Sequence, residues 1–250
     1  MRFEYVFQTP DKRGVAMNIT KISKDFWQQG YVELVDFFDQ GLMDKMQNII
    51  VQHYGSAPEF SHSPEFIDKS ATEVIPWFPQ QEGVKSFDEI EQDQSLIEIS
   101  RQILGENWRT LYCMAMFSRA GSKGQAWHQD CPPENANQFN LNRLVYTMDV
   151  GGEVGGEVLI MPGSHKVGEL SAGKPDEDFK EQIVLTPKKG TLVLIHGHSW
   201  HRVLPIKNHH RVSTNFRAMP ADTPDDITDI CVYRNMRYQF SSGRVLEDRA

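Results

Sequence analysis

The chain has 250 residues, of which 39% are hydrophobic, and its 34 acidic residues outnumber its 26 basic residues, so its formal charge is −8. This is the composition of an ordinary globular protein, and a chain of this length can bury a core as one domain. The acidic excess argues against nucleic acid or an anionic membrane as a partner, because either needs a basic face that displaces counterions from phosphates.

The cysteines and the N-terminal residues indicate the compartment. Glu4 interrupts the apolar run that a secretory signal needs, and no apolar run approaches the ~18 residues of a membrane-spanning helix. Cys113, Cys131 and Cys231 are far apart, so neither a disulfide framework nor a zinc ribbon is expected. We therefore expect a cytoplasmic protein outside the membrane, and the sequence does not indicate its oligomeric state.

The first part of the chain, 1–107, reads as mostly helical. In chain order the patterns predict a helix at 24–29 after a cap at Ser23, a strand at 31–36, a helix at 42–54, a loop at 56–82 and a helix from about 87 to 104. Glycines follow the three helices and are typical helix stops. The segment 56–82 contains four prolines and no clear periodicity. Long loops in compact domains are often lids, and we interpret this one so.

From residue 108 the pattern changes to short β-rich runs. They cover 111–117, 144–150, 157–161, 182–185, 191–195 and 212–219, separated by Gly- and Pro-rich turns. A series of strands without intervening helices favours an antiparallel arrangement. We expect a mainly β protein with flanking helices, in which a double-stranded β-helix (a jelly-roll or cupin-like core) spans 108–220 and a polar extension covers 221–250.

Two sequence segments carry the candidate chemistry. His128 and Asp130 are two residues apart, so on an extended strand they share one face. A second histidine-rich run contains His196, His198 and His201 and ends a later strand. A jelly roll can bring such distant strands together, and two imidazoles with one carboxylate form the open facial triad of non-haem Fe(II) oxygenases. Strand alternation alone does not select among the three histidines.

Arg211 and Ser213 come next on the following predicted strand. Residues at positions i and i+2 of a strand share a face. A guanidinium beside a hydroxyl is suited to holding a carboxylate. The pair therefore indicates an anion site close to the metal candidate.

These segments, together with the block Gly155-Gly156-Glu157 to His165, resemble the phytanoyl-CoA dioxygenase (PhyH) family of Fe(II)- and 2-oxoglutarate-dependent oxygenases. The resemblance covers roughly 109–219 and implies a jelly-roll core. It also implies His128, Asp130 and His201 as iron ligands, with His198 the competing candidate for the third position.

The same resemblance implies how the co-substrate binds. Arg211 matches the residue that holds the distal carboxylate of 2-oxoglutarate, Ser213 is expected beside it, and Thr147 matches a position that often lines the same pocket. The implied activity consumes O2 and 2-oxoglutarate, releases succinate and CO2, and hydroxylates an aliphatic C–H bond of a small molecule. The alternative is a non-oxidative metal-binding jelly roll, such as a cupin-like isomerase or a binding protein. The sequence does not identify the substrate.

Overall fold

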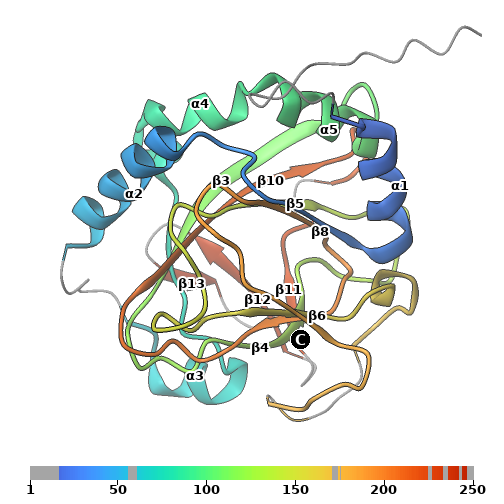
Figure 1. The fold of residues 1–250 in the computed structure, drawn as a ribbon. Coiled ribbons are helices and arrows are strands. Elements are labelled where there is room, and N and C mark those ends of the chain that lie inside the picture. The colour runs from blue at the N-terminus through green and yellow to red at the C-terminus, as the bar shows by residue number, and fades with distance from the viewer. Residues whose placement is uncertain are drawn as a thin grey trace, which may run out of the picture.

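Two antiparallel β-sheets face each other, and most of the helices cover the outside of one of them (Figure 1). This computed structural model describes residues 17–55, 61–170, 174, 176–224, 227–232, 236–241 and 244–246. The segment around Glu4 and part of the predicted loop, 56–60, lie outside the described residues. Within the described residues, no helix has both the length and the apolar character needed to span a bilayer.

The first sheet has six strands in the order β1-β8-β5-β10-β3-β2. Their bounds are β1 Tyr31–Leu34, β8 Leu192–His196, β5 Leu141–Val145, β10 Arg211–Met219, β3 Arg109–Ser118 and β2 Ile75–Trp77. The β3 and β10 pairing is the longest in the sheet and runs from Arg211 opposite Ser118 to Met219 opposite Arg109. It places β10 in the middle of the sheet, where all nine of its residues are buried.

The second sheet has seven strands in the order β13-β12-β11-β4-β9-β6-β7. Their bounds are β13 Arg244–Leu246, β12 Met236–Ser241, β11 Ile230–Val232, β4 Gln125–Gln129, β9 His201–Val203, β6 Val158–Ile160 and β7 Ile183–Leu185. The strand β9 pairs with β4 on one side and with β6 on the other. Short strands that alternate between two facing sheets confirm the predicted jelly roll.

The helices lie mainly against the six-stranded sheet. Their bounds are α1 Ile19–Gln29, α2 Gln40–Tyr54, α3 Pro64–Ser70, α4 Asp88–Glu91 and α5 Gln94–Leu104, with short 3₁₀ turns at Pro79–Glu82, Lys85–Phe87 and Ser164–Lys166. In Figure 1, α2, α4 and α5 cross above this sheet, whereas α3 lies on the opposite side of the molecule near β4. The largest apolar cluster joins Phe26, Met46 and Ile99 of these helices to Val212 and Phe216 of β10.

Several local predictions need correction. The segment 56–82 is not a continuous loop, because its described part contains α3, β2 and a 3₁₀ turn. The predicted helix at 87–104 is divided into α4 and α5, since the Asp93 side chain accepts a hydrogen bond from the Leu96 backbone and starts a new helix there. The predicted strand at 144–150 begins and ends earlier, as β5.

The C-terminal segment after residue 220 adds strands to the second sheet. The first of them, β11, pairs with β4, and β12 pairs with β11. We expected a polar extension here, but Ile230 and Phe240 line the cavity between the sheets. The edge of β4 that carries the histidine motif is therefore covered by strands that the sequence pattern did not reveal.

Candidate metal centre

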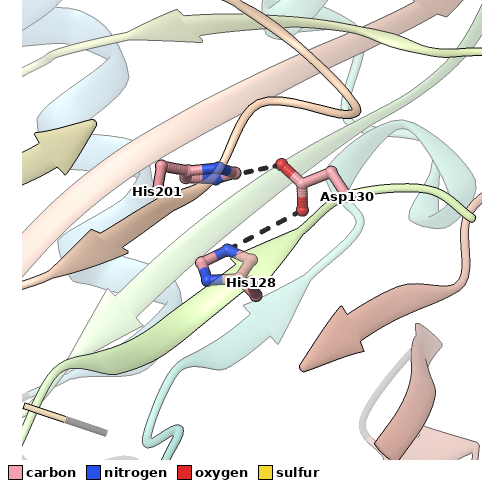
Figure 2. Close-up of side chains that lie close together, drawn as sticks. All are labelled: His128, Asp130 and His201. Carbon is pink, nitrogen blue, oxygen red and sulfur yellow. Dashed lines mark ion pairs between the residues drawn. The ribbon is translucent and has the colours of Figure 1, made fainter. Parts of the chain in front are cut away.

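Three buried side chains meet between the sheets, at the paired strands β4 and β9. His128 lies on β4 directly opposite His201 of β9, and Asp130 follows the end of β4. The distance from His201 Nε2 to Asp130 Oδ2 is 3.2 Å, and that from His128 Nε2 to Asp130 Oδ1 is 3.9 Å. Figure 2 shows the carboxylate of Asp130 pointing between the two imidazoles.

A β-bulge in β4 shapes this arrangement. Gln125 is paired with Val203, whereas His128 is paired with His201, so β4 has one residue more than β9 between the two pairs. The extra residue lets both Gln125 and His128 face the cavity although they are three positions apart. The adjacent Trp127 instead donates its indole N–H to the backbone oxygen of Glu177.

The backbone fixes the tautomer of both imidazoles. Nδ1 of His128 is 2.8 Å from the backbone oxygen of Ala126, and Nδ1 of His201 is 3.0 Å from that of Ser199. A carbonyl oxygen can only accept, so Nδ1 carries the proton in each neutral ring. In a neutral ring held this way, Nε2 has a lone pair that a metal can accept, as in metal sites whose ligand histidines are oriented by backbone acceptors.

The charge states also suit a cation. Burial, reinforced by the neighbouring His201, lowers the pKa of His128 to about 4, so its imidazole is neutral near pH 7. Burial alone would raise the pKa of Asp130, but the Arg217 guanidinium and the two histidines outweigh it and hold this pKa well below its usual range. The centre thus offers a neutral imidazole at His128, an ionised carboxylate at Asp130 and the imidazole of His201.

This donor set fits iron. The ligand atoms of His128, Asp130 and His201 lie within 4.8 Å of one another, and they form the one group of this kind found among the described residues. Two histidines and one carboxylate on one face, with the remaining positions open, are characteristic of non-haem Fe(II) oxygenases.

His196 and His198 lie elsewhere. His196 ends β8 and packs between aromatic rings, with its ring 4.3 Å from that of Phe139. His198 Nε2 is 3.1 Å from the backbone oxygen of Pro132. The chain crosses from β8 in one sheet to β9 in the other before His201, so strand alternation does not extend across this turn.

Arg211 begins β10 on the facing sheet and lines the same cavity as the three ligand candidates. Its Nε donates to the backbone oxygen of Gly156 at 3.0 Å, and its Nη1 donates to Ser213 Oγ at 3.0 Å. It is only 2% exposed, and among the described residues no carboxylate lies within ion-pair distance of it, although Glu157 acts on it from farther away. A buried guanidinium whose hydrogen bonds go to neutral groups can take a carboxylate ligand as an ion-pair partner.

Thr147 does not join this cavity. Its hydroxyl donates to Oε1 of Gln47 on α2 at 2.6 Å, on the helix side of the sheet. The preceding residue, Tyr146, lines the cavity instead, with its ring 5.8 Å from the Arg211 guanidinium carbon. Neighbouring residues of an extended chain point to opposite sides, so a shift of one residue separates the expected position from the observed one.

Two further polar side chains of β10, Asn215 and Arg217, also line the cavity, and the sequence interpretation missed them. The alternation that joined Arg211 to Ser213 continues through both residues. Extending that pattern by two more steps would have found them.

A larger cleft of about 640 Å³ adjoins the cavity. Gln125 lines both spaces, and the cleft is also lined by Pro64, Lys123, Asp176 and Arg202.

Comparison with known proteins agrees with this geometry. The sequence profile of the phytanoyl-CoA dioxygenase (PhyH) family matches residues 26–212. No curated protein sequence matches significantly.

Solved structures share the fold. The epimerase SnoN from nogalamycin biosynthesis, described as non-haem and α-ketoglutarate-dependent, superposes with a TM-score of 0.67 at 16% identity, over 84% of this chain and 87% of its own. HygX from Streptomyces hygroscopicus, solved with nickel, 2-oxoglutarate and hygromycin B bound, gives a TM-score of 0.60 at 15% identity, over 81% of this chain and 87% of its own.

Proposed function

Because the chain belongs to the phytanoyl-CoA dioxygenase family, we propose that it is a non-haem Fe(II)- and 2-oxoglutarate-dependent dioxygenase. It hydroxylates an aliphatic C–H bond of a small molecule and releases succinate and CO2. One observation carries the proposal: the buried group of His128, Asp130 and His201 shares a cavity with Arg211, a buried guanidinium whose hydrogen bonds go to neutral groups.

Each residue has a distinct part in this proposal. His128, Asp130 and His201 hold the iron, and their buried setting keeps bulk water from it. Arg211 and Ser213, which line the same cavity from the facing sheet, would hold the distal carboxylate of 2-oxoglutarate. When bound, the iron supplies the activation of dioxygen, and the chain supplies orientation and a dry site.

Entry of the co-substrate requires side chains to move. The cavity encloses about 30 Å³, enough for a water molecule or two. Met114 and Met116 line it, and their unbranched side chains can change rotamer at low cost. The adjoining cleft of about 640 Å³ has room for a small-molecule substrate, and Gln125 lies at the boundary between the two spaces.

Epimerisation is the second candidate reaction, and its basis is the fold shared with SnoN, which is described as an epimerase. Both reactions begin at a substrate C–H bond, but they differ in the mass of the product. Hydroxylation adds one oxygen atom, whereas epimerisation leaves the mass unchanged. Mass spectrometry of the product from a screen for substrate-stimulated succinate formation separates the two reactions.

A direct test uses the purified protein with Fe(II) and 2-oxoglutarate without oxygen. We expect a weak visible charge-transfer band in the wild type and no band in His128→Ala. A non-oxidative metal-binding jelly roll would bind the metal without this band. The proposal is refuted if the wild type lacks the band or if His128→Ala retains it.

A further inference from the structure

Arg217, near the end of β10, is bonded directly to one of the proposed metal ligands. It is 1% exposed, and its Nη2 donates to Oδ1 of Asp130 at 3.0 Å. Among the described residues Asp130 is its carboxylate partner, and its other hydrogen bonds go to neutral groups. The iron and 2-oxoglutarate roles proposed above leave Arg217 without an assigned task.

A network of neutral side chains fixes the position of this guanidinium. Its Nε donates to Asn142 Oδ1 at 3.0 Å, and its Nη1 donates to the Tyr112 hydroxyl at 2.9 Å. Asn142 Oδ1 also accepts from Asn215 Nδ2 at 2.7 Å, and its amide nitrogen donates to the Ile195 backbone oxygen. Because three donor groups on Arg217 are each held by a different partner, of which Asn142 and Asp130 are buried and Tyr112 is half-buried, its Nη2 has one fixed direction.

The two oxygens of Asp130 consequently have different neighbours. Oδ1 accepts from Arg217 and lies 3.9 Å from Nε2 of His128, whereas Oδ2 lies 3.2 Å from Nε2 of His201. We propose that Arg217 is a positioning residue that engages Oδ1, so that Asp130 offers only Oδ2 to the metal. This inference rests on the proposed function, since it concerns the same metal centre.

The number of open coordination positions gives this restriction its purpose. Three single-atom ligands leave three of the six positions of an octahedral metal open. The proposed chemistry uses all three, because 2-oxoglutarate chelates through two atoms and dioxygen needs the third. A carboxylate that binds through both oxygens would take one of these positions, so engaging Oδ1 keeps the position free for the co-substrate.

Loss of Arg217 should therefore affect the two ligands differently. Removing a positive charge beside Asp130 reduces repulsion of the metal, and a second carboxylate oxygen becomes available to it. Metal affinity should stay equal or rise. Affinity for 2-oxoglutarate should fall, because the dianion competes with that oxygen and loses a nearby cation.

The experiment measures binding of Co²⁺ to the full chain, and then of 2-oxoglutarate to the cobalt-loaded protein, by calorimetry. For Arg217→Met we expect Co²⁺ binding at least as tight as in the wild type and 2-oxoglutarate binding at least about tenfold weaker. Arg217→Lys, which keeps the charge and a donor, should recover most of the affinity. The visible spectrum of the cobalt protein without 2-oxoglutarate should change in Arg217→Met, because the number of ligands changes.

The control is Arg143→Met. Arg143 is equally buried on the neighbouring strand β5, but its guanidinium pairs with Glu91 and it does not line the cavity. This variant should lose stability and leave both affinities and the cobalt spectrum unchanged. If Arg217→Met does not fold, Tyr112→Phe, which loosens Arg217 without deleting it, should weaken 2-oxoglutarate binding by a smaller factor and leave Co²⁺ binding intact.

Several results would overturn the inference. For Arg217→Met, any one of three results would do so: a 2-oxoglutarate affinity within twofold of the wild type, weaker Co²⁺ binding, or an unchanged cobalt spectrum. If only Tyr112→Phe folds, an unchanged 2-oxoglutarate affinity in that variant would also overturn the inference. These results assume a wild type that binds both ligands. A wild type that binds neither Co²⁺ nor 2-oxoglutarate refutes the proposed function itself, so the two failures are distinguishable.

Discussion

The two sheets contribute different chemistry to the cavity between them. The seven-stranded sheet supplies His128 from β4, His201 from β9 and Asp130 from the residue after β4, and these imidazoles and this carboxylate are donors suited to a cation. The six-stranded sheet supplies Arg211 and Arg217 from β10, which are cationic groups suited to an anion. A metal and a dianion can therefore each find complementary partners on facing walls.

This division means that metal binding and co-substrate binding should be separable by mutation. Substitutions on β4 and β9 should remove the metal and with it the chelated co-substrate. Substitutions on β10 should weaken the co-substrate and spare the metal. The following predictions test this difference, from the largest expected effect to the smallest.

The first prediction removes a ligand from the seven-stranded sheet. His201→Ala should weaken Fe(II) binding by about 100-fold or more, because one of three ligands is lost from a buried centre. His198→Ala is the matched control, since His198 is also buried but bonds to the backbone of Pro132. Anaerobic equilibrium dialysis measures both. Equal losses in the two variants would contradict the assignment of His201.

The second prediction concerns the six-stranded sheet. Arg211→Met should weaken 2-oxoglutarate binding about 10- to 100-fold, the effect of losing hydrogen bonds to a charged group. Fe(II) affinity should stay within a factor of about two, because Arg211 makes no contact with the three ligands. Calorimetric titration with Fe(II) and with 2-oxoglutarate measures the two affinities. An equal loss of both would contradict the separation of metal binding from co-substrate binding.

The third prediction tests how Arg211 is held in place. Gly156 has φ +69°, and a Cβ there would collide with Cδ of Arg211. Gly152 has φ +57° but open space around its missing Cβ. Alanine at either position should cost about 1 kcal/mol of unfolding free energy through backbone strain. Only Gly156→Ala should also weaken 2-oxoglutarate binding, by about tenfold, and calorimetry should show the Gly152→Ala variant unaffected.

The smallest expected effect concerns pH. Burial and the neighbouring His198 and His165 hold the pKa of His196 well below its usual range. The unfolded chain therefore binds this proton at a higher pH than the folded chain does. The contribution of His196 to the free energy of unfolding is fully present above about pH 6.5. It is lost as the pH falls below that value, by at most about 1.4 kcal/mol per pH unit.

His196→Gln should accordingly show a shallower loss of unfolding free energy between pH 7 and pH 5 than the wild type. Denaturant unfolding at several pH values measures this difference. His209→Gln, at an exposed position just before β10, is the comparison variant. Identical pH profiles for His196→Gln and the wild type would show that this histidine does not contribute.

Sequence reasoning located much of the centre because it depends on short-range spacing. His128 and Asp130, two residues apart, needed only the geometry of extended chain to share a side. The pair Arg211 and Ser213 followed from the same rule. The prediction that Thr147 lines the cavity was wrong by one residue. Successive residues of an extended chain face opposite sides, and here Tyr146 faces the cavity.

The remaining parts depend on contacts between distant segments. The third histidine could not be chosen by alternation, because the turn between β8 and β9 changes sheets before His201. The strands β11 and β12 have no strong pattern of their own and exist as extensions of the β4 edge. Nothing in the spacing of Asp130 and Arg217 along the chain shows that they form an ion pair.

The sequence by itself therefore determined the type of fold, the His-x-Asp motif and the arginine that we propose binds an anion, since strand alternation and local turns encode these features over a few residues. Tertiary structure alone decided which histidine faces Asp130, that Tyr146 and not Thr147 lines the cavity, and that Arg217 engages one oxygen of the carboxylate. The physical reason is that sheet pairing and burial join residues far apart in the chain, and their charges act on one another only once water between them is excluded.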